Sequence, residues 1–145
     1  MKRSLEQRRA KDTLHKIKGR LKDFKGKKKN RERYLSRAKS LPAMIVMCGL
    51  GQTAATLLSV GKGKKDNPDQ MLYDDLASWL CKGEDAPYKD ETDLIKAIVE
   101  GDRKIYIKAQ VEAIKWLEWL KKFATAYLSF EEAECDDPSL QSSEE

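Results

Sequence analysis

The residues with the clearest chemical potential are the cations of residues 1–40, where 17 Lys and Arg stand against 4 Asp and Glu. Residues 131–145 carry 7 acidic residues and no basic one, and residues 41–130 are close to neutral, with 12 basic and 13 acidic residues. A block of positive charge this dense repels itself, and a bound polyanion relieves the repulsion and gains counterion release. The segment therefore predicts a nucleic-acid partner, contacted through its phosphates because no base-reading element stands out.

Residues that could perform catalysis are sparse. The single histidine, His15, lies within the basic segment, where a surface position is the commoner role. The three cysteines, Cys48, Cys81 and Cys135, form no CxxC pair and have no zinc-ligand spacing with the histidine. No nucleophile-elbow, zinc-protease or phosphate-loop motif occurs. We expect a protein that is not an enzyme and takes no cofactor and no metal ion.

A row of aromatic residues near the C-terminus allows two interpretations. Trp116, Trp119, Phe123 and Tyr127 follow one another at spacings of 3, 4 and 4, so they share one face of a helix. Such a row could stack nucleic-acid bases. We favour a core role, because a helical domain of this size needs large apolar anchors.

The elements that must position these groups are predicted to be helices. Apolar residues recur at helical spacing, as in Leu14, Ile17 and Leu21, and no strand-like alternation of any length occurs. The predicted helices span about 3–25, 30–40, 42–60, 69–82, 92–100 and 102–129. We expect an all-α fold, a compact bundle of five to seven helices over residues 1–130, followed by a disordered acidic tail over 131–145.

Particular residues set the expected helix ends. Pro42 is suited to the first turn of a new helix, and Gly49 and Gly51 predict either a break or the close approach of another backbone. Thr92 is the expected cap of the short fifth segment. The inner stripe of the last helix is expected to comprise Ile105, Ala109, Val111, Ala113, Trp116, Leu117, Leu120, Ala124, Tyr127 and Leu128.

Composition also bears on the compartment. The N-terminus is charged and is not an apolar signal region. The most apolar run, 43–60, contains glycine, glutamine, threonine and serine, so we expect a buried helix and no membrane partner. Three widely spaced cysteines are typical of reduced thiols, and we expect a cytoplasmic protein.

Three stretches together resemble a known family. They are Leu5–Ala10, the segment Tyr34–Pro42 that leads into Gly49–Gln52, and a C-terminal pattern of Tyr106, Ala109, Glu112 and Ala113 followed by Leu117–Ala124. In this order and spacing, over residues 4–128, they resemble the small helical subunit of the Cmr complex, the type III-B CRISPR effector. The resemblance implies a helical bundle without catalytic activity. It also implies several copies stacked beside the backbone subunits that hold the guide RNA, with target cleavage left to other subunits.

The resemblance and the charge pattern together give candidate RNA contacts. Arg8, Arg9, Lys39 and Gln52 stand at matching motif positions, and Lys16, Lys18 and Arg37 are added from charge alone. For Arg9 and Lys39 an ion pair or a helix-end cap is the alternative role. The implied partners are the other Cmr subunits, additional copies of the chain, the guide CRISPR RNA and the target RNA, whose sequence is read by base pairing.

Stacking would need two complementary faces on each copy. The stretch 66–100 holds 10 acidic and 3 basic residues, and it could meet the basic segment of a neighbouring copy through residues such as Asp74 and Asp75. Taken singly, this adjacent pair is more simply interpreted as a solvated surface. Two further functions stay open: a free-standing basic protein that coats nucleic acid regardless of sequence, and a small nuclease, against which the missing ligand cluster argues.

Overall fold

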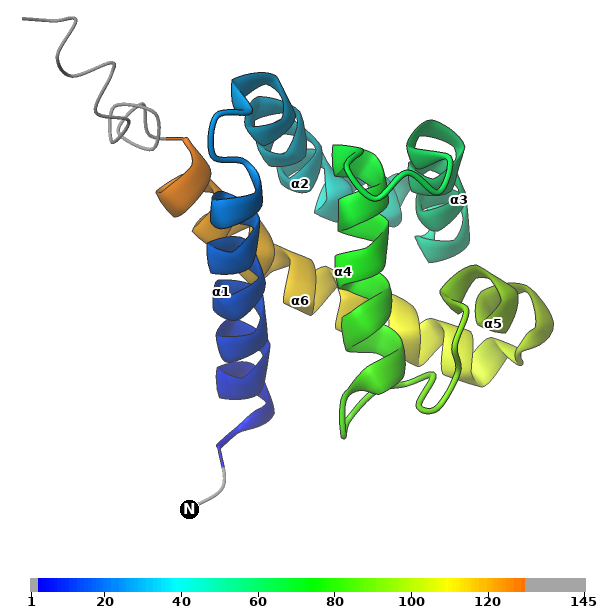
Figure 1. Ribbon diagram of the computed structural model, residues 1–145. Helices are drawn as coiled ribbons and strands as arrows, with labels where there is room; N and C mark the ends of the chain where they lie inside the picture. The colour runs from blue at the N-terminus through cyan, green and yellow to red at the C-terminus, as the bar shows by residue number, and fades with distance from the viewer. Residues whose placement is uncertain (1–2, 130–145) are drawn as a thin grey trace, which may run out of the picture.

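A computed structural model of the chain describes residues 3–129, and within these residues all regular structure is helical (Figure 1). The six helices are α1 (Leu5–Asp23), α2 (Lys28–Cys48), α3 (Leu50–Gly61), α4 (Pro68–Lys82), α5 (Leu94–Glu100) and α6 (Arg103–Leu128). The prediction of an all-α bundle of five to seven helices is confirmed. The predicted acidic tail, 131–145, lies outside the described residues, so its disorder stays a prediction.

The long helix α6 organises the bundle. Both α1 and α2 pack along it, α4 crosses in front of it, and α3 packs on α4 and α2 (Figure 1). The core that these helices enclose is apolar, and its largest fully buried side chains are Trp116, Tyr34, Ile17, Leu41, Ile45, Leu50, Leu57, Leu72, Leu76, Leu80, Leu94 and Leu117. Among the described residues, no helix is both long enough and apolar enough to cross a membrane.

Helix α1 begins with a capping box. The Ser4 hydroxyl accepts from the Gln7 backbone N–H at 3.1 Å, and the Gln7 side chain accepts from the Ser4 N–H at 2.9 Å. These bonds satisfy two amides that a helix start leaves without partners. The apolar stripe predicted for this helix also includes Phe24. Of its four residues, Ile17 and Phe24 are buried in the core, and Leu14 and Leu21 are half-buried.

The break in the central helix falls at Gly49 rather than at Pro42. Pro42 is buried inside α2, which continues to Cys48, so the prediction of a new helix at Pro42 is wrong. Proline has a helical φ but removes one backbone hydrogen bond and crowds the preceding turn. The packing of α2 against α6, α4 and α3 offsets this cost. Gly49 has φ +89° and ψ 159°, a conformation open almost only to glycine, and α2 ends there.

Side chains of α6 complete the junction between α2 and α3. The Gly51 N–H donates to the Tyr106 hydroxyl at 2.9 Å, and the Leu50 N–H donates to Gln110 Oε1 at 3.0 Å. A Cβ on Gly49 would lie 3.1 Å from the same Tyr106 oxygen. The close approach expected at these glycines is therefore made by side chains rather than by another backbone.

Two later expectations need correction. The cap of α5 is Asp93, whose carboxylate accepts from the Lys96 N–H, and not Thr92. In α6 the predicted inner residues Ile105, Val111 and Tyr127 are 36%, 49% and 38% exposed. Ile105 and Val111 line a surface hollow together with Asp85, Ala86 and Pro87 of the segment before α5.

Candidate nucleic-acid interface

Every arginine between residues 8 and 37 is engaged within the described chain. Arg8 pairs with Asp85 at 2.6 Å, Arg33 and Arg37 both contact Asp69, and the Arg31 guanidinium donates to the Leu128 carbonyl oxygen at 2.5 Å. Arg9 and Arg20 form buried ion pairs. The planar guanidinium suits such pairs because its fork of donors matches a carboxylate. Much of the positive charge counted in the sequence therefore serves the fold.

Among the RNA-contact candidates taken from the family motifs, Arg9 makes the most hydrogen bonds within the chain. Its Nε and Nη2 donate to the two oxygens of Glu112 at 2.7 and 2.8 Å, and its Nη1 donates to Glu6 at 3.0 Å. The Arg9 residue is 7% exposed. The bonds to Glu112 raise the pKa of Arg9 above its ordinary value, despite partial burial. The sequence left three roles open for Arg9: an RNA contact, an ion pair or a helix-end cap. The ion pair is present in the fold.

Arg20 forms the second buried ion pair, with Asp75 of the adjacent Asp74 and Asp75 in α4. Its guanidinium contacts both oxygens of Asp75 at 2.8 and 3.0 Å, and the Tyr34 hydroxyl donates to the same carboxylate at 2.7 Å. Burial raises the pKa of Asp75, while the bonds from Arg20 lower it less strongly. Burial also raises the pKa of Tyr34 well above its ordinary value. The interpretation of Asp75 as a solvated residue is wrong, because it is 6% exposed and internally paired. Its neighbour Asp74 is half-buried and accepts from Gln70.

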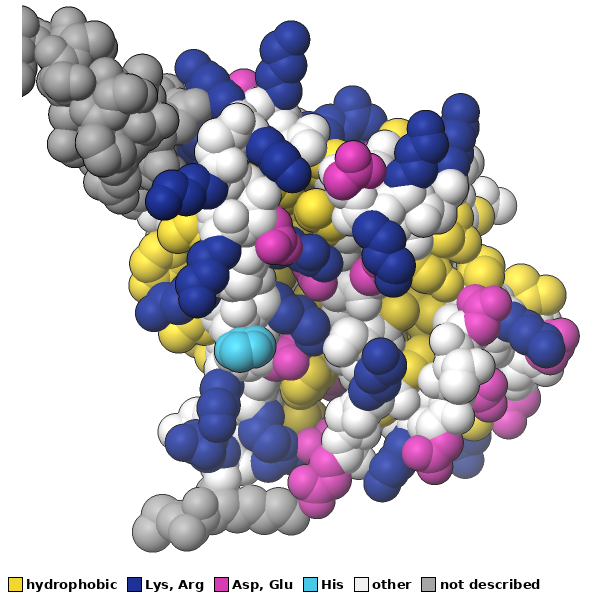
Figure 2. Space-filling model, in the orientation of Figure 1, with side chains coloured by type: hydrophobic (Ala, Val, Ile, Leu, Met, Phe, Trp, Pro, Cys, Tyr) yellow, Lys and Arg dark blue, Asp and Glu magenta, His cyan; other side chains and the backbone are white. Residues whose placement is uncertain are grey.

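The lysines behave differently from the arginines. Most lysines of α1, α2 and the turn between them are exposed and have no side-chain partner among the described residues: Lys11, Lys22, Lys25, Lys27, Lys28, Lys29 and Lys39. Lys16 is an exception, since it pairs with Asp12 at 2.5 Å and lies 5.2 Å from the Trp116 ring centre. Figure 2 shows Lys and Arg side chains along α1 and across the upper edge of this face, whereas Asp and Glu gather around α5.

The sequence-derived candidates divide accordingly. Arg8, Arg9, Lys16 and Arg37 are held in contacts within the chain. Lys18, Lys39 and Gln52 are exposed on three different helices, with Lys18 lying 5.8 Å from the centre of the Tyr127 ring. The structure therefore leaves these three able to meet a partner and assigns the other four at least partly to the fold.

A second group of lysines was missed from the sequence. The loop before α4 carries Lys62, Lys64 and Lys65, all exposed, and the side chain of Asn30 near the start of α2 donates to the backbone oxygen of Asp66 at 3.4 Å. The fold thereby brings this loop beside the start of α2, which carries Lys28 and Lys29 after the cap residue Lys27. We call these six lysines the basic end. The lysine run of the loop was the available signal, but its position required the fold.

A comparison with models of known protein families shows to which family the chain belongs. The family model described as CRISPR-associated protein (Cas_Cmr5) matches residues 5–127. The chain belongs to this family. It is a small subunit of the Cmr complex of type III-B CRISPR systems, as the resemblance implied.

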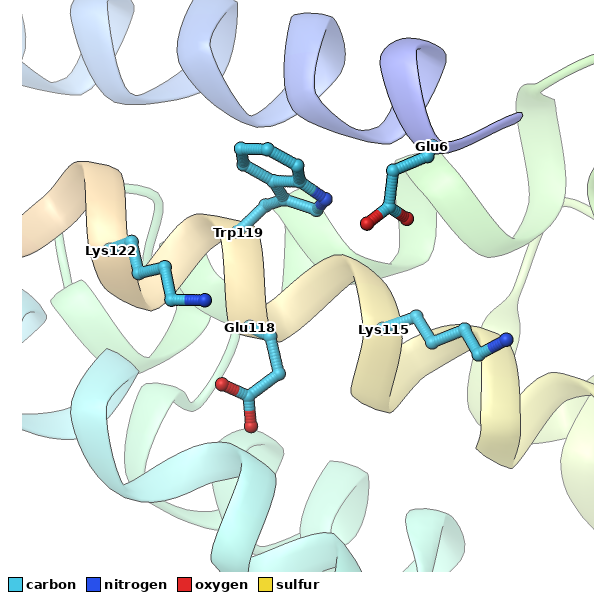
Figure 3. A pocket seen from close by; sticks show the side chains of 5 residues that line it. All are labelled: Glu6, Lys115, Glu118, Trp119 and Lys122. Atoms are coloured by element: carbon cyan, nitrogen blue, oxygen red, sulfur yellow. The ribbon is translucent and has the colours of Figure 1, made fainter. Parts of the chain in front are cut away.

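The aromatic row of this Cas_Cmr5 chain is divided between core and surface. Trp116 is fully buried, as the core interpretation predicted, but Trp119 and Phe123 are half-buried and Tyr127 is exposed. The rings of Trp119 and Phe123 stack with centroids 5.6 Å apart. Figure 3 shows Trp119 pointing toward α1 above a hollow that Glu6, Lys115, Glu118 and Lys122 also line. Two carboxylates and two ammonium groups balance there, so this hollow has no preference for an anion.

The side chains that could bind a metal ion do not cluster within the described residues. Within residues 3–129, no three His, Cys, Asp or Glu side chains come together as a potential metal site. His15 and Cys48 are exposed, and Cys81 is buried. Cys135 lies outside the described residues.

Proposed function

We propose that this chain is a non-catalytic subunit that stacks in several copies within the Cmr complex and helps hold target RNA through its outward lysines. The observation that carries the proposal is a division within the basic segment: each arginine from residue 8 to 37 contacts another group of the chain, whereas most lysines there are left on the surface. Lysine is a strongly hydrated point charge on a flexible stem, suited to phosphates regardless of sequence. We retain Lys18, Lys39 and Gln52 as RNA contacts and add the basic end.

The distribution of charge also supports stacking. Exposed acidic residues gather around α5 and the segment before it, including Glu84, Asp90, Glu91 and Glu100, away from the basic end (Figure 2). A head-to-tail arrangement of copies brings unlike faces together and continues as a row. Asp75 is buried and paired within the chain, so Asp74 and Asp75 do not form the acidic face expected from the sequence. We propose instead that the acidic group around α5 contacts a neighbouring copy. Some lysines would then contact a neighbouring copy instead of RNA.

The proposal is tested by assembling the complex in cytoplasm-like reducing conditions from co-expressed Cmr subunits and guide RNA. The variant replaces Lys27, Lys28 and Lys29 with glutamate. The matched control replaces the exposed Lys108, Lys115 and Lys122 of α6 in the same way, since these belong neither to the basic end nor to the acidic group around α5. We expect both to join the complex. The first variant should lower the affinity for target RNA by about tenfold or more at low salt, because it removes cations that bind phosphates and adds carboxylates that repel them. The control should change it little.

Native mass spectrometry of the same preparations gives the number of copies of this subunit per complex, and we expect more than one. Equal RNA affinity for the two triple variants would contradict the RNA-contact role, and a single copy would contradict stacking. Tight, salt-sensitive RNA binding by the chain alone, without incorporation into the complex, would instead support the free-standing nucleic-acid-binding alternative.

A further inference from the structure

Two arginines of α2 share one carboxylate. Arg33 reaches Asp69 with Nε at 3.5 Å and Nη2 at 3.2 Å, and Arg37 does the same at 3.5 and 3.1 Å. The Asp69 side chain is fully buried, whereas those of Arg33 and Arg37 are 51% and 21% exposed. One carboxylate neutralises only one guanidinium, so the cluster keeps one net positive charge at the surface.

The fold holds this arrangement in place. Arg33 and Arg37 are four residues apart on one helical face, where two like charges would repel each other in an isolated helix. Asp69 relieves that repulsion from the first turn of α4, and its own N–H donates to the cap residue Asn67 at 2.8 Å. The two guanidiniums are therefore fixed side by side before any ligand arrives.

Hydroxyl groups complete a hollow around the arginines. Arg33, Ser36, Arg37 and Ser40 line it, and they occupy one face of α2. Ser36 is exposed and its hydroxyl has no partner among the described residues, while the Ser40 hydroxyl donates to the Arg37 carbonyl oxygen at 2.8 Å. Both arginines use Nε and Nη2 for Asp69, so Nη1 of each remains as a donor for a second anion.

We propose that this hollow binds a phosphate group, and that its phosphate in the assembled complex is a phosphodiester of RNA. The second half of the proposal rests on the proposed function. Two guanidiniums and a hydroxyl supply donors from several directions, which suits the tetrahedral oxygens of a phosphate.

The surroundings favour a nucleic-acid phosphate over a carboxylate of another protein. Asn30, one turn before Arg33 on α2, contacts the loop of the basic end at Asp66, so the hollow lies beside those lysines. A polymer with a charge at every residue can occupy the hollow and contact the lysines at once. A single protein carboxylate would satisfy only the hollow.

The first test uses the full chain and inorganic phosphate, followed by a short oligouridylate, at constant pH and ionic strength. Arginine side-chain signals in ¹H–¹⁵N spectra report on each guanidinium. We expect saturable shifts at Arg33 and Arg37 with both probes, no saturable shift at the exposed Arg103, and loss of the Arg33 shift in Arg37→Gln. The absence of saturation, or equal shifts at Arg103, would overturn the site.

The second test measures target-RNA affinity of the complex carrying Arg33→Gln, Arg33→Lys or Ser36→Ala, with Arg103→Gln as the matched control. Arg33→Gln should weaken affinity about tenfold and reduce the salt slope by about one. Arg33→Lys should weaken it less but measurably, because charge remains and the fork is lost. Ser36→Ala changes no charge and should weaken affinity about twofold to threefold.

Two outcomes separate this inference from the function on which it rests. If Arg33→Gln prevents incorporation into the complex while RNA is absent, the hollow holds a protein carboxylate and the proposal is overturned. If the complex binds RNA equally with and without this subunit, the proposed function fails, and the phosphate titration still decides whether the hollow is an anion site.

Discussion

Glu112 joins three helices through a single carboxylate. From α6 it accepts two hydrogen bonds from Arg9 of α1 and one, at 2.8 Å, from the indole N–H of Trp79 in α4. The side chains of Arg9 and Glu112 are 8% and 12% exposed. A buried ion pair adds little net stability compared with apolar residues, but losing one partner leaves a charge buried without compensation.

Replacing Arg9 with leucine should therefore lower the free energy of unfolding by about 3 kcal/mol. The double variant Arg9→Leu with Glu112→Leu should recover part of that loss, because no unpaired carboxylate remains. Urea unfolding followed by circular dichroism measures both, with Lys11→Leu as the control, an exposed cation of the same helix. A loss in Arg9→Leu no greater than in the control would contradict the role assigned to the pair.

The sequence shows how many cations the basic segment carries, but not which of them form ion pairs inside the fold and which stay exposed. Arg9 and Lys39 were equivalent candidates on the sequence, yet one is buried against Glu112 and the other is exposed. Their difference depends on a carboxylate 103 positions further along the chain, which no local pattern reveals. The general preference of arginine for buried pairs was the one usable signal.

The junction between α2 and α3 is the element-scale feature with the strictest demand on residue type. Gly49 combines a positive φ with the nearby Tyr106 hydroxyl, which itself accepts from the first turn of α3. Any side chain at this position meets backbone strain and that oxygen together.

Gly49→Ala should destabilise the fold by about 2–3 kcal/mol, toward the upper end of the cost of a residue held in a glycine conformation. Gly26→Ala is the matched control, because Gly26 has φ +75° and no atom lies within 4 Å of its added Cβ. That control should cost about 1 kcal/mol from backbone strain alone. Thermal unfolding of both variants measures the difference, and equal losses would remove the role assigned to Tyr106.

Helices were predictable as elements, and their ends were less so. The break at Gly49 was predictable because glycine at such a position is costly inside a helix, whereas Pro42 was misleading because tertiary packing holds α2 through it. Thr92 and Asp93 are adjacent capping residues, and the sequence alone does not rank them. The exposure of Ile105 and Val111 depends on how the distant segment of Asp85, Ala86 and Pro87 packs beside α6, which no local pattern reveals.

For the whole molecule, buried phenols should make stability sensitive to alkaline pH. Burial raises the pKa of Tyr73 to about 12 and raises those of Tyr34 and Tyr88. The unfolded chain releases these protons near pH 10, so the folded state binds more protons above that value. The stabilising contribution is complete below about pH 10 and is lost as pH rises toward 12.

The free energy of unfolding should therefore fall by on the order of 1 kcal/mol between about pH 10 and 11 from Tyr73 alone. Urea unfolding across this range measures the loss, and absorbance of the phenolate follows the titration. Tyr73→Phe should start less stable, because the Ile95 N–H loses its acceptor, but should show a shallower decline with pH. An equal slope in the variant and the parent would show that Tyr73 contributes nothing to the effect.

The separation of arginines from lysines has a consequence for how this family can change over time. Arginines such as Arg9 and Arg20 each depend on a particular carboxylate, so substitutions there should occur together with changes at Glu112 or Asp75. Lysines of the basic end depend on no described side chain, so individual ones can be exchanged for lysines at neighbouring positions if the total charge is kept. Homologues should therefore show paired variation inside the bundle and freely drifting lysine positions at its end.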